Sequence, residues 1–87
     1  MSIVKYIGEG VGKRFNINQA VKDGWGIEYT GEECLVGLQL QDREKPKHKT
    51  KITGFRWDMG ILIVVLKNSW LCLDHCINQY KLIKKGR

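Results

Sequence analysis

The chain has 87 residues, of which 43% are apolar and 28% are charged, and its net charge is +6 at pH 7. This length fits one domain with a small core, and the apolar fraction excludes a disordered chain. The positive charge favours an anionic partner, either nucleic acid (DNA or RNA) or an acidic protein surface, although a small protein also gains solubility from such a charge.

The cysteine count and the hydropathy indicate the cellular compartment in which we expect the protein. Three cysteines are an odd number, whereas a secreted domain of this size normally uses an even set for disulfides. The longest apolar run, residues 61–66, is far shorter than the roughly 20 residues that span a membrane. The N-terminus also lacks the apolar stretch of a signal peptide. We therefore expect a cytoplasmic protein without a membrane partner.

The chain is expected to form a single domain, because no linker is long enough to divide it. Its predicted parts are an N-terminal extension at 1–31 with one short helix, a β-barrel core at 32–84 and a basic tail at 85–87.

One short helix is predicted in the extension, at about residues 17–23. Asn16 and Gln19 have the spacing of a capping box, and Gly24 suits the position that follows a helix end.

Two further segments of the extension have strand patterns. Residues 3–7 are interpreted as an edge strand. Trp25, Ile27 and Tyr29 alternate with small or polar residues, which predicts another short strand. A turn at 30–31 then leads into the core.

The first strands of the core are predicted from alternation. Apolar residues alternate with polar residues or glycine from Cys34 to Leu40, the period-2 pattern of a strand with one buried face. A long polar loop follows. Thr53, Phe55 and Trp57 then alternate on a second strand.

A central strand is predicted at residues 61–66, which are apolar on both faces and rich in β-branched side chains. Turns at 58–60 and 67–68 flank this strand, because glycine and asparagine tolerate positive φ. Residues 70–73 return as its partner.

A short turn at 78–80 and a last strand at 81–84 complete the core. The order of a strand, a long loop, a three-stranded meander, a short turn and a last strand resembles SH3-like and Tudor-like small barrels. The resemblance covers about residues 33–84 and rests on pattern and spacing, without a diagnostic motif. It implies a mainly β fold, a small barrel of five or so antiparallel strands, but no particular function, because such folds host many functions.

Lysines occupy every second position of one segment, at Lys45, Lys47, Lys49 and Lys51. In an extended strand, alternate side chains share one face about 6.6–6.8 Å apart, a spacing close to that of phosphates along a nucleic-acid strand. Pro46 indicates a loop or an edge strand, and lysines on an edge also prevent aggregation between sheets. Anion recognition and edge protection both remain open interpretations of this lysine ladder.

Positive charge is concentrated in the second half of the chain. Residues 1–42 contain four Lys/Arg and six Asp/Glu, a net of −2, whereas residues 43–87 contain eleven and three, a net of +8. In a small barrel the last strand can lie near the long first loop, which would join the lysine ladder to a second basic cluster, namely Lys81, Lys84, Lys85 and Arg87.

The aromatic residues have two interpretations. Trp57 shares a face with Phe55, while Arg56 between them points to the opposite face. Core packing is one use of these rings, since each buries about 150–250 Å². An exposed Trp57 beside basic side chains would instead be a stacking platform for nucleic-acid bases. Trp25, between two glycines, is expected to be the most exposed tryptophan.

Three kinds of reactive site are poorly supported. Cys72, His75, Cys76 and the distant Cys34 lack the usual paired spacing of a zinc site, and in a continuous strand the first and third are about 13 Å apart. Residues 8–14 lack the glycine and Ser/Thr positions of a phosphate loop. No group can be assigned to orient a cysteine–histidine pair for catalysis. We therefore expect no metal, no cofactor and no enzyme activity.

Two functions fit a binding module of this kind. The first is nucleic-acid binding through phosphate contacts, with little sequence readout. Its predicted residues are Lys45, Lys47, Lys49, Lys51, Arg56, Trp57, Lys84 and Lys85. The alternative is a protein-interaction module, such as a small regulator or inhibitor of a larger enzyme, of the kind common among bacteriophage products. Its predicted anchors are Trp25, Tyr29, Trp57 and Tyr80.

Overall fold

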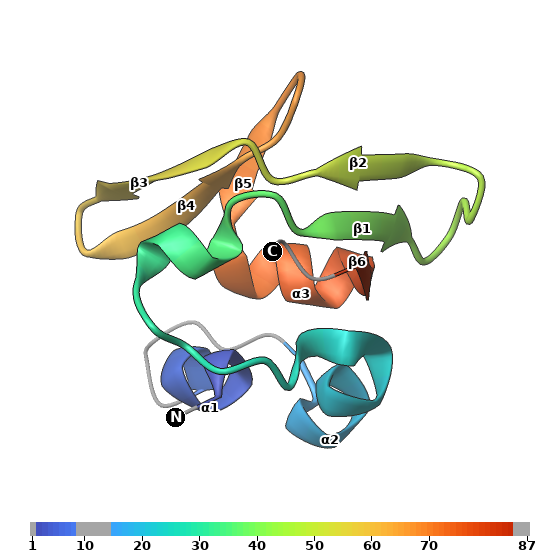
Figure 1. Cartoon of the computed structure of the whole chain (residues 1–87), viewed down its shortest axis with the longest axis horizontal. Helices are drawn as coiled ribbons and strands as arrows, with labels where there is room; N and C mark the ends of the chain where they lie inside the picture. The colour runs from blue at the N-terminus through green and yellow to red at the C-terminus, as the bar shows by residue number, and fades with distance from the viewer. Residues whose placement is uncertain (1, 9–14, 85–87) are drawn as a thin grey trace.

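The structure, a computed structural model, describes residues 2–8 and 15–84 (Figure 1). This part of the chain contains six strands in two antiparallel sheets, ordered β2-β1-β6 and β3-β4-β5. The predicted small, mainly β fold is therefore confirmed. The strands are β1 (Gln39–Asp42), β2 (Lys49–Lys51), β3 (Gly54–Asp58), β4 (Ile61–Val65), β5 (Trp70–Cys72) and β6 (Tyr80–Lys84).

Short helical segments pack against the sheets. Figure 1 shows α1 and α2 together on one side of the molecule, with α3 between them and the two sheets. The π-helical segment η1 contacts β6, and α3 contacts β4, β5 and β6. The helical segments are α1 (Ile3–Gly8), α2 (Ile17–Ala20), η1 (Val21–Trp25), the 3₁₀ helix η2 (Glu32–Leu35) and α3 (Leu73–Gln79).

The order of the elements matches the predicted layout in part, because β2 lies where only a loop was predicted and α3 lies where a strand end and a short turn were predicted. β1 is followed by a polar loop and β2, then by the β3-β4-β5 meander, a helix and the final strand β6. Within the described residues the two sheets share no strand ladder, so the strands pack as two sheets and do not close into a barrel. The chain passes from one sheet to the other at Ile52 and Thr53, where the Ile52 side chain is buried in the core.

The predicted central strand is β4, which pairs with β3 on one side and β5 on the other. Leu62 and Val64 belong to the core, and Ile63 is buried on the outer face of the sheet. The β3–β4 turn places Met59 at φ 52° and Gly60 at φ 79°. Two successive residues with positive φ are typical of a type I′ hairpin turn, whose twist matches that of the strands.

The N-terminal strands were predicted incorrectly. Residues 3–7 belong to the helix α1, in which Ile3 and Val4 are completely buried against the core. Residues 25–29 form no strand and contribute one isolated β-bridge to the N-terminal segment. Packing into the core overrides the strand propensity of these β-branched residues.

Two parts of the predicted core strands are helical. Residues 32–35 form η2, so β1 begins at Gln39 and not at Cys34. The segment predicted as a strand end and a short turn is the helix α3. Its buried residues Leu73, Cys76 and Ile77 have the i, i+3, i+4 spacing of one helix face.

The predicted helix at 17–23 is confirmed in two parts. Asn16 caps α2, where its Oδ1 accepts a hydrogen bond from the Gln19 amide at 3.1 Å. The chain continues into η1, which is interrupted at Gly24 with φ 96°. A Cβ at Gly24 would lie 2.5 Å from the carbonyl oxygen of Leu82, so only glycine lets the helical segment approach β6 this closely.

Trp25 is the largest completely buried side chain of the described residues. Its indole Nε1 donates a 2.9 Å hydrogen bond to the carbonyl oxygen of Tyr80 on β6. The expectation that Trp25 is the most exposed tryptophan is therefore wrong, because Gly24 beside it serves close packing and not exposure. Through Trp25, the N-terminal helices and the sheets share one hydrophobic core.

An ion pair joins the same helical layer to the loop after β1. Arg43 pairs with Asp23 of η1 and donates a second hydrogen bond to the carbonyl oxygen of Ile77 at 2.8 Å. Only 8% of the Asp23 side chain is exposed. Burial by itself raises the pKa of Asp23, but hydrogen bonds from Arg43 and Gln19, with nearby positive charge, lower that pKa overall.

Substitution of Gly24 tests the contact with β6. Gly24→Ala is expected to destabilise the protein by about 2 kcal/mol or more, because alanine is strained at this φ and its Cβ collides with the Leu82 carbonyl. The matched control is Gly54→Ala, where a Cβ meets no atom within 4 Å, with an expected effect of at most about 0.5 kcal/mol. Urea unfolding measures both variants, and equal losses would contradict this packing.

Substitution of Arg43 tests the ion pair. Arg43→Ala leaves the Asp23 carboxylate buried without its cation and is expected to cost about 3 kcal/mol of unfolding free energy at neutral pH. Arg43→Lys is the matched control. It keeps the positive charge but cannot donate to both Asp23 and the Ile77 carbonyl oxygen, so it is expected to cost about 1 kcal/mol.

The Arg43→Ala penalty is also expected to depend on pH. A lowered pKa means that Asp23 stabilises the wild-type fold above its unfolded pKa, and that this stabilisation is lost as pH falls through the folded value. The difference between wild type and Arg43→Ala therefore shrinks below about pH 4. Urea unfolding at several pH values measures it, and a penalty that stays constant down to about pH 3 would contradict the assignment.

Candidate functional site

The lysine ladder is extended only over its second half. Lys49 and Lys51 lie on β2, whereas Lys45 and Lys47 lie in the turn between β1 and β2. Asp42 Oδ1 accepts hydrogen bonds from two amides of this turn, at 2.8 and 3.0 Å. These bonds, above all the one from the Lys45 amide, lower the pKa of Asp42. The lysine ladder is thus divided into a strand part and a turn part.

The strand part lies on a sheet edge, because β2 is the outer strand of its sheet. The amide of Ile52 donates to the carbonyl oxygen of Leu38 on β1 at 3.0 Å. By the alternation of an antiparallel ladder, Lys49 and Lys51 direct their own amides to the free edge, and their side chains are exposed. This edge therefore offers backbone donors as well as ammonium groups.

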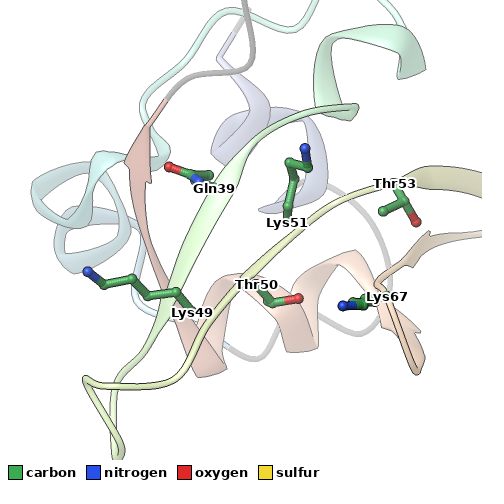
Figure 2. A pocket seen from close by; sticks show the side chains of 6 residues that line it. All are labelled: Gln39, Lys49, Thr50, Lys51, Thr53 and Lys67. Atoms are coloured by element: carbon green, nitrogen blue, oxygen red, sulfur yellow. The ribbon is translucent and has the colours of Figure 1, made fainter.

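A pocket of about 280 Å³ lies beside this edge (Figure 2). We call it the lysine pocket, and the residues that line it are Gln39, Lys49, Thr50, Lys51, Thr53 and Lys67. Figure 2 shows that Thr50 and Lys67 point toward each other, while Lys49 and Lys51 extend from the other face of β2. Because Lys67 comes from the loop after β4, both sheets contribute to the pocket.

Lys67 is a pocket residue that the sequence analysis missed. It lies in a four-residue connection between β4 and β5, closed by a 2.8 Å hydrogen bond from the Leu66 amide to the Ser69 carbonyl oxygen, where a two-residue turn was predicted. No local pattern distinguishes this lysine, which is far from the ladder in sequence. Only the packing of the two sheets brings it opposite Thr50.

The lysine pocket has cationic and hydroxyl residues around it, although apolar atoms supply most of its lining surface. None of its lining residues is acidic, three of them carry ammonium groups, and two carry hydroxyls. The Thr53 hydroxyl donates to the carbonyl oxygen of Val65 at 3.1 Å, which fixes one wall of the pocket on β4. Ammonium, hydroxyl and backbone N–H donors are the groups that contact phosphate oxygens in nucleic-acid complexes.

The sheet register brings the second basic cluster close to the ladder. Gln41 of β1 lies opposite Lys49 of β2 and opposite Lys81 of β6. Lys84 lies opposite Gln39, two rows further along and beyond a register shift between Gln39 and Leu40. Neighbouring strands are about 4.8 Å apart, so β2 and β6 are separated by about 10 Å. Lys85 and the rest of the basic tail lie outside the residues that the structure describes.

An aromatic–cationic pair lies on the outer face of the other sheet. The guanidinium of Arg56 is above the Trp70 ring, 5.2 Å from its centroid. Trp70 is 58% exposed, whereas Ile63, opposite Arg56 on the same face, is only 4% exposed. Arg56 therefore points away from the face of Phe55, as predicted from alternation.

Trp57 has acidic surroundings. It lies on the opposite face of β3 from Arg56 and is 48% exposed. The Tyr29 hydroxyl donates to Glu32 Oε1 at 2.8 Å, and this bond, with a smaller contribution from the Trp57 indole, lowers the pKa of Glu32. The exposure of Trp57 suits a stacking platform, but its neighbour is a carboxylate and not a lysine.

The other predicted anchors of a protein partner are less accessible. Trp25 is completely buried and so presents no surface to a partner. Tyr29 stacks on Tyr6 with ring centroids 4.2 Å apart, and Tyr80 packs against the core. Burial raises the pKa of both Tyr29 and Tyr80, so their hydroxyls stay protonated at neutral pH.

The thiols are dispersed. Cys34 and Cys72 are partly buried. Cys76 is buried, and this burial raises the pKa of the Cys76 thiol. Within residues 2–8 and 15–84, no three His, Cys, Asp or Glu side chains are arranged to hold a metal ion. In the same ranges no helix reaches the length and hydropathy of a membrane span. Residues 9–14, most of the glycine-rich segment, lie outside the described part.

Comparisons with protein-family models, with curated proteins and with solved structures find no match to this chain. The lysine pocket and the Arg56–Trp70 pair are the candidate site of this protein.

The two exposed tryptophans are expected to respond differently to ionic quenchers. Trp70 lies beside Arg56 and Trp57 beside Glu32, so iodide should quench Trp70 and caesium should quench Trp57 preferentially. In steady-state fluorescence, Trp57→Phe is therefore expected to be quenched more by iodide, and Trp70→Phe more by caesium. Buried Trp25 gives the same background in both variants. Equal quenching constants would contradict these surroundings.

Proposed function

We propose that the protein is a non-enzymatic module that binds nucleic acid through phosphate contacts, with little sequence readout. The lysine pocket carries this proposal, because Lys49, Lys51 and Lys67 are among its lining residues and none of those residues is acidic. Contacts of Lys and Arg with phosphates supply essentially all of the affinity of non-specific nucleic-acid binding.

Further cations extend this surface. Lys81 continues the row of Lys49 through Gln41 of β1 to β6, and Lys45 and Lys47 lie in the adjoining turn. Edge protection explains lysines on an outer strand. It does not explain Lys67, which comes from a loop between two other strands and still lies in the pocket.

The salt dependence of binding tests the proposal. If about four phosphates are neutralised, the slope of log Kobs against log salt is expected to be about −3 on a single strand and about −4 on duplex DNA. Fluorescence anisotropy of a labelled oligonucleotide between about 50 and 200 mM salt measures this slope. Affinity that does not change over this range would contradict binding through phosphates.

Charge reversal locates the surface. Lys49→Glu/Lys67→Glu is expected to weaken binding at least about tenfold and to reduce the salt slope by about 2. The matched control is Lys5→Glu/Lys22→Glu, which changes net charge equally on exposed lysines of the helical layer. Its expected loss is less than about threefold. Equal losses would show that net charge, and not the lysine pocket, determines affinity.

A second candidate function is protein binding, favoured by the exposed apolar tip of the β3–β4 hairpin. Met59 is 94% exposed, Ile61 50% and Trp57 48%. Exposed apolar surface of this kind on one hairpin is typical of interaction sites. A complex formed through this tip would keep its affinity in Lys49→Glu/Lys67→Glu and lose it in Met59→Asp, the reverse of the pattern expected for nucleic acid.

A further inference from the structure

We propose that the nucleic acid is single-stranded and that one of its bases stacks on Trp70. This inference rests on the proposed function and adds the class of nucleic acid. The lysine pocket suits the phosphates of any strand, whereas an indole ring outside the core suits only a base whose face is accessible.

The lysine pocket and Trp70 are neighbours on the surface. Thr53 lines the pocket, and its amide and hydroxyl both donate to the carbonyl oxygen of Val65, at 2.8 and 3.1 Å. Val65 lies opposite Gly54 on β3 and opposite Trp70 on β5. Because β3 and β5 are each one strand spacing from β4, their backbones are about 10 Å apart. This separation is within the span of a short oligonucleotide.

The surface beside Trp70 is open at Gly54. Gly54 lies in the same row as Trp70, and the position of its missing Cβ has no atom within 4 Å. Lys67 and Trp70 are close in sequence, because Lys67 lies in the connection between β4 and β5 and Trp70 is the first residue of β5. A phosphate held by Lys67 is thus adjacent to the strand that carries the ring.

Trp70 has the exposure that a stacking platform for a base requires. It exposes 58% of its surface on a sheet face, although an apolar ring of this size is usually covered. The Arg56 guanidinium above the ring restrains it and adds positive charge beside it. Ile63 on the same face is only 4% exposed, so the Arg56 and Trp70 side chains lie over a well-packed residue.

Stacking on Trp70 distinguishes single strands from duplexes. In a duplex each base face is covered by its neighbours in the stack, so an indole ring gains nothing along the helix. A single strand can turn one base out while its phosphates stay on the lysines. Base–aromatic stacking is sequence-tolerant, because every base has a π-face, and it therefore fits the limited sequence readout proposed above.

Three probes of about 12 nucleotides separate stacking from charge. They are fluorescein-labelled oligothymidylate, an abasic strand with the same phosphates, and a duplex of mixed sequence. Anisotropy at about 100 mM salt is expected to rank oligothymidylate above both other probes. Trp70→Ala is expected to weaken oligothymidylate binding by about 5- to 150-fold and to leave the abasic strand within about twofold. Trp70→Phe should restore most of the loss.

Control variants make the assignment specific. Met59→Ala removes another exposed apolar side chain and is expected to change no probe by more than about twofold. Trp57→Ala removes the exposed tryptophan beside Glu32. A loss in Trp57→Ala that equals or exceeds the loss in Trp70→Ala would overturn the proposal.

The remaining outcomes distinguish a failure of stacking on Trp70 from a failure of the proposed nucleic-acid binding. Equal affinity for oligothymidylate and the abasic strand, tighter binding of the duplex, or no effect of Trp70→Ala would overturn stacking on Trp70. In each of these cases, salt-dependent binding reduced by Lys49→Glu/Lys67→Glu would still support the proposed function. Absence of salt-dependent binding to all three probes would overturn both.

Discussion

The close contact between the N-terminal helices and β6 is the constraint on which the rest of the structure depends. Gly24 lets the chain approach Leu82, and Trp25 then fills the core and donates its indole hydrogen to the Tyr80 carbonyl oxygen. This contact holds β6, which positions β1 and, through β1, the outer strand β2 with Lys49. The cationic surface is therefore supported by a buried tryptophan from a helical segment that contributes none of the residues of the lysine pocket.

Much of the fold could be predicted from the sequence, because the alternation in β3, the fully apolar β4 and the Met59–Gly60 turn are local signals. The helices α1 and α3 could not be predicted by the same reasoning. Leu73 ends the apolar pattern of the strand β5 and begins the apolar pattern of the helix α3. No glycine, proline or asparagine separates the two elements. The spacing of Leu73, Cys76 and Ile77 was the available helical signal. It was obscured by the strand directly before it.

The candidate site was predictable only where it follows the chain. Lys49 and Lys51 come from the ladder, but Lys67 reaches the pocket through the packing of two sheets, which no local pattern encodes. The aromatic partner of Arg56 illustrates the same limit. Neighbours along a strand point to opposite faces, so its partner is Trp70 from β5 and not Trp57 beside it in sequence.

The position of β1 between β2 and β6 has a consequence for folding. β2 follows β1 directly, whereas β6 arrives only after the β3-β4-β5 meander and α3. Local hairpins form quickly, and pairing across long stretches of chain is slow because the entropy of loop closure must be overcome first. The meander thus has all its partners before β1 acquires its second neighbour. We therefore expect β6 to complete the lysine-bearing sheet only after the β1–β2 hairpin and the meander have formed.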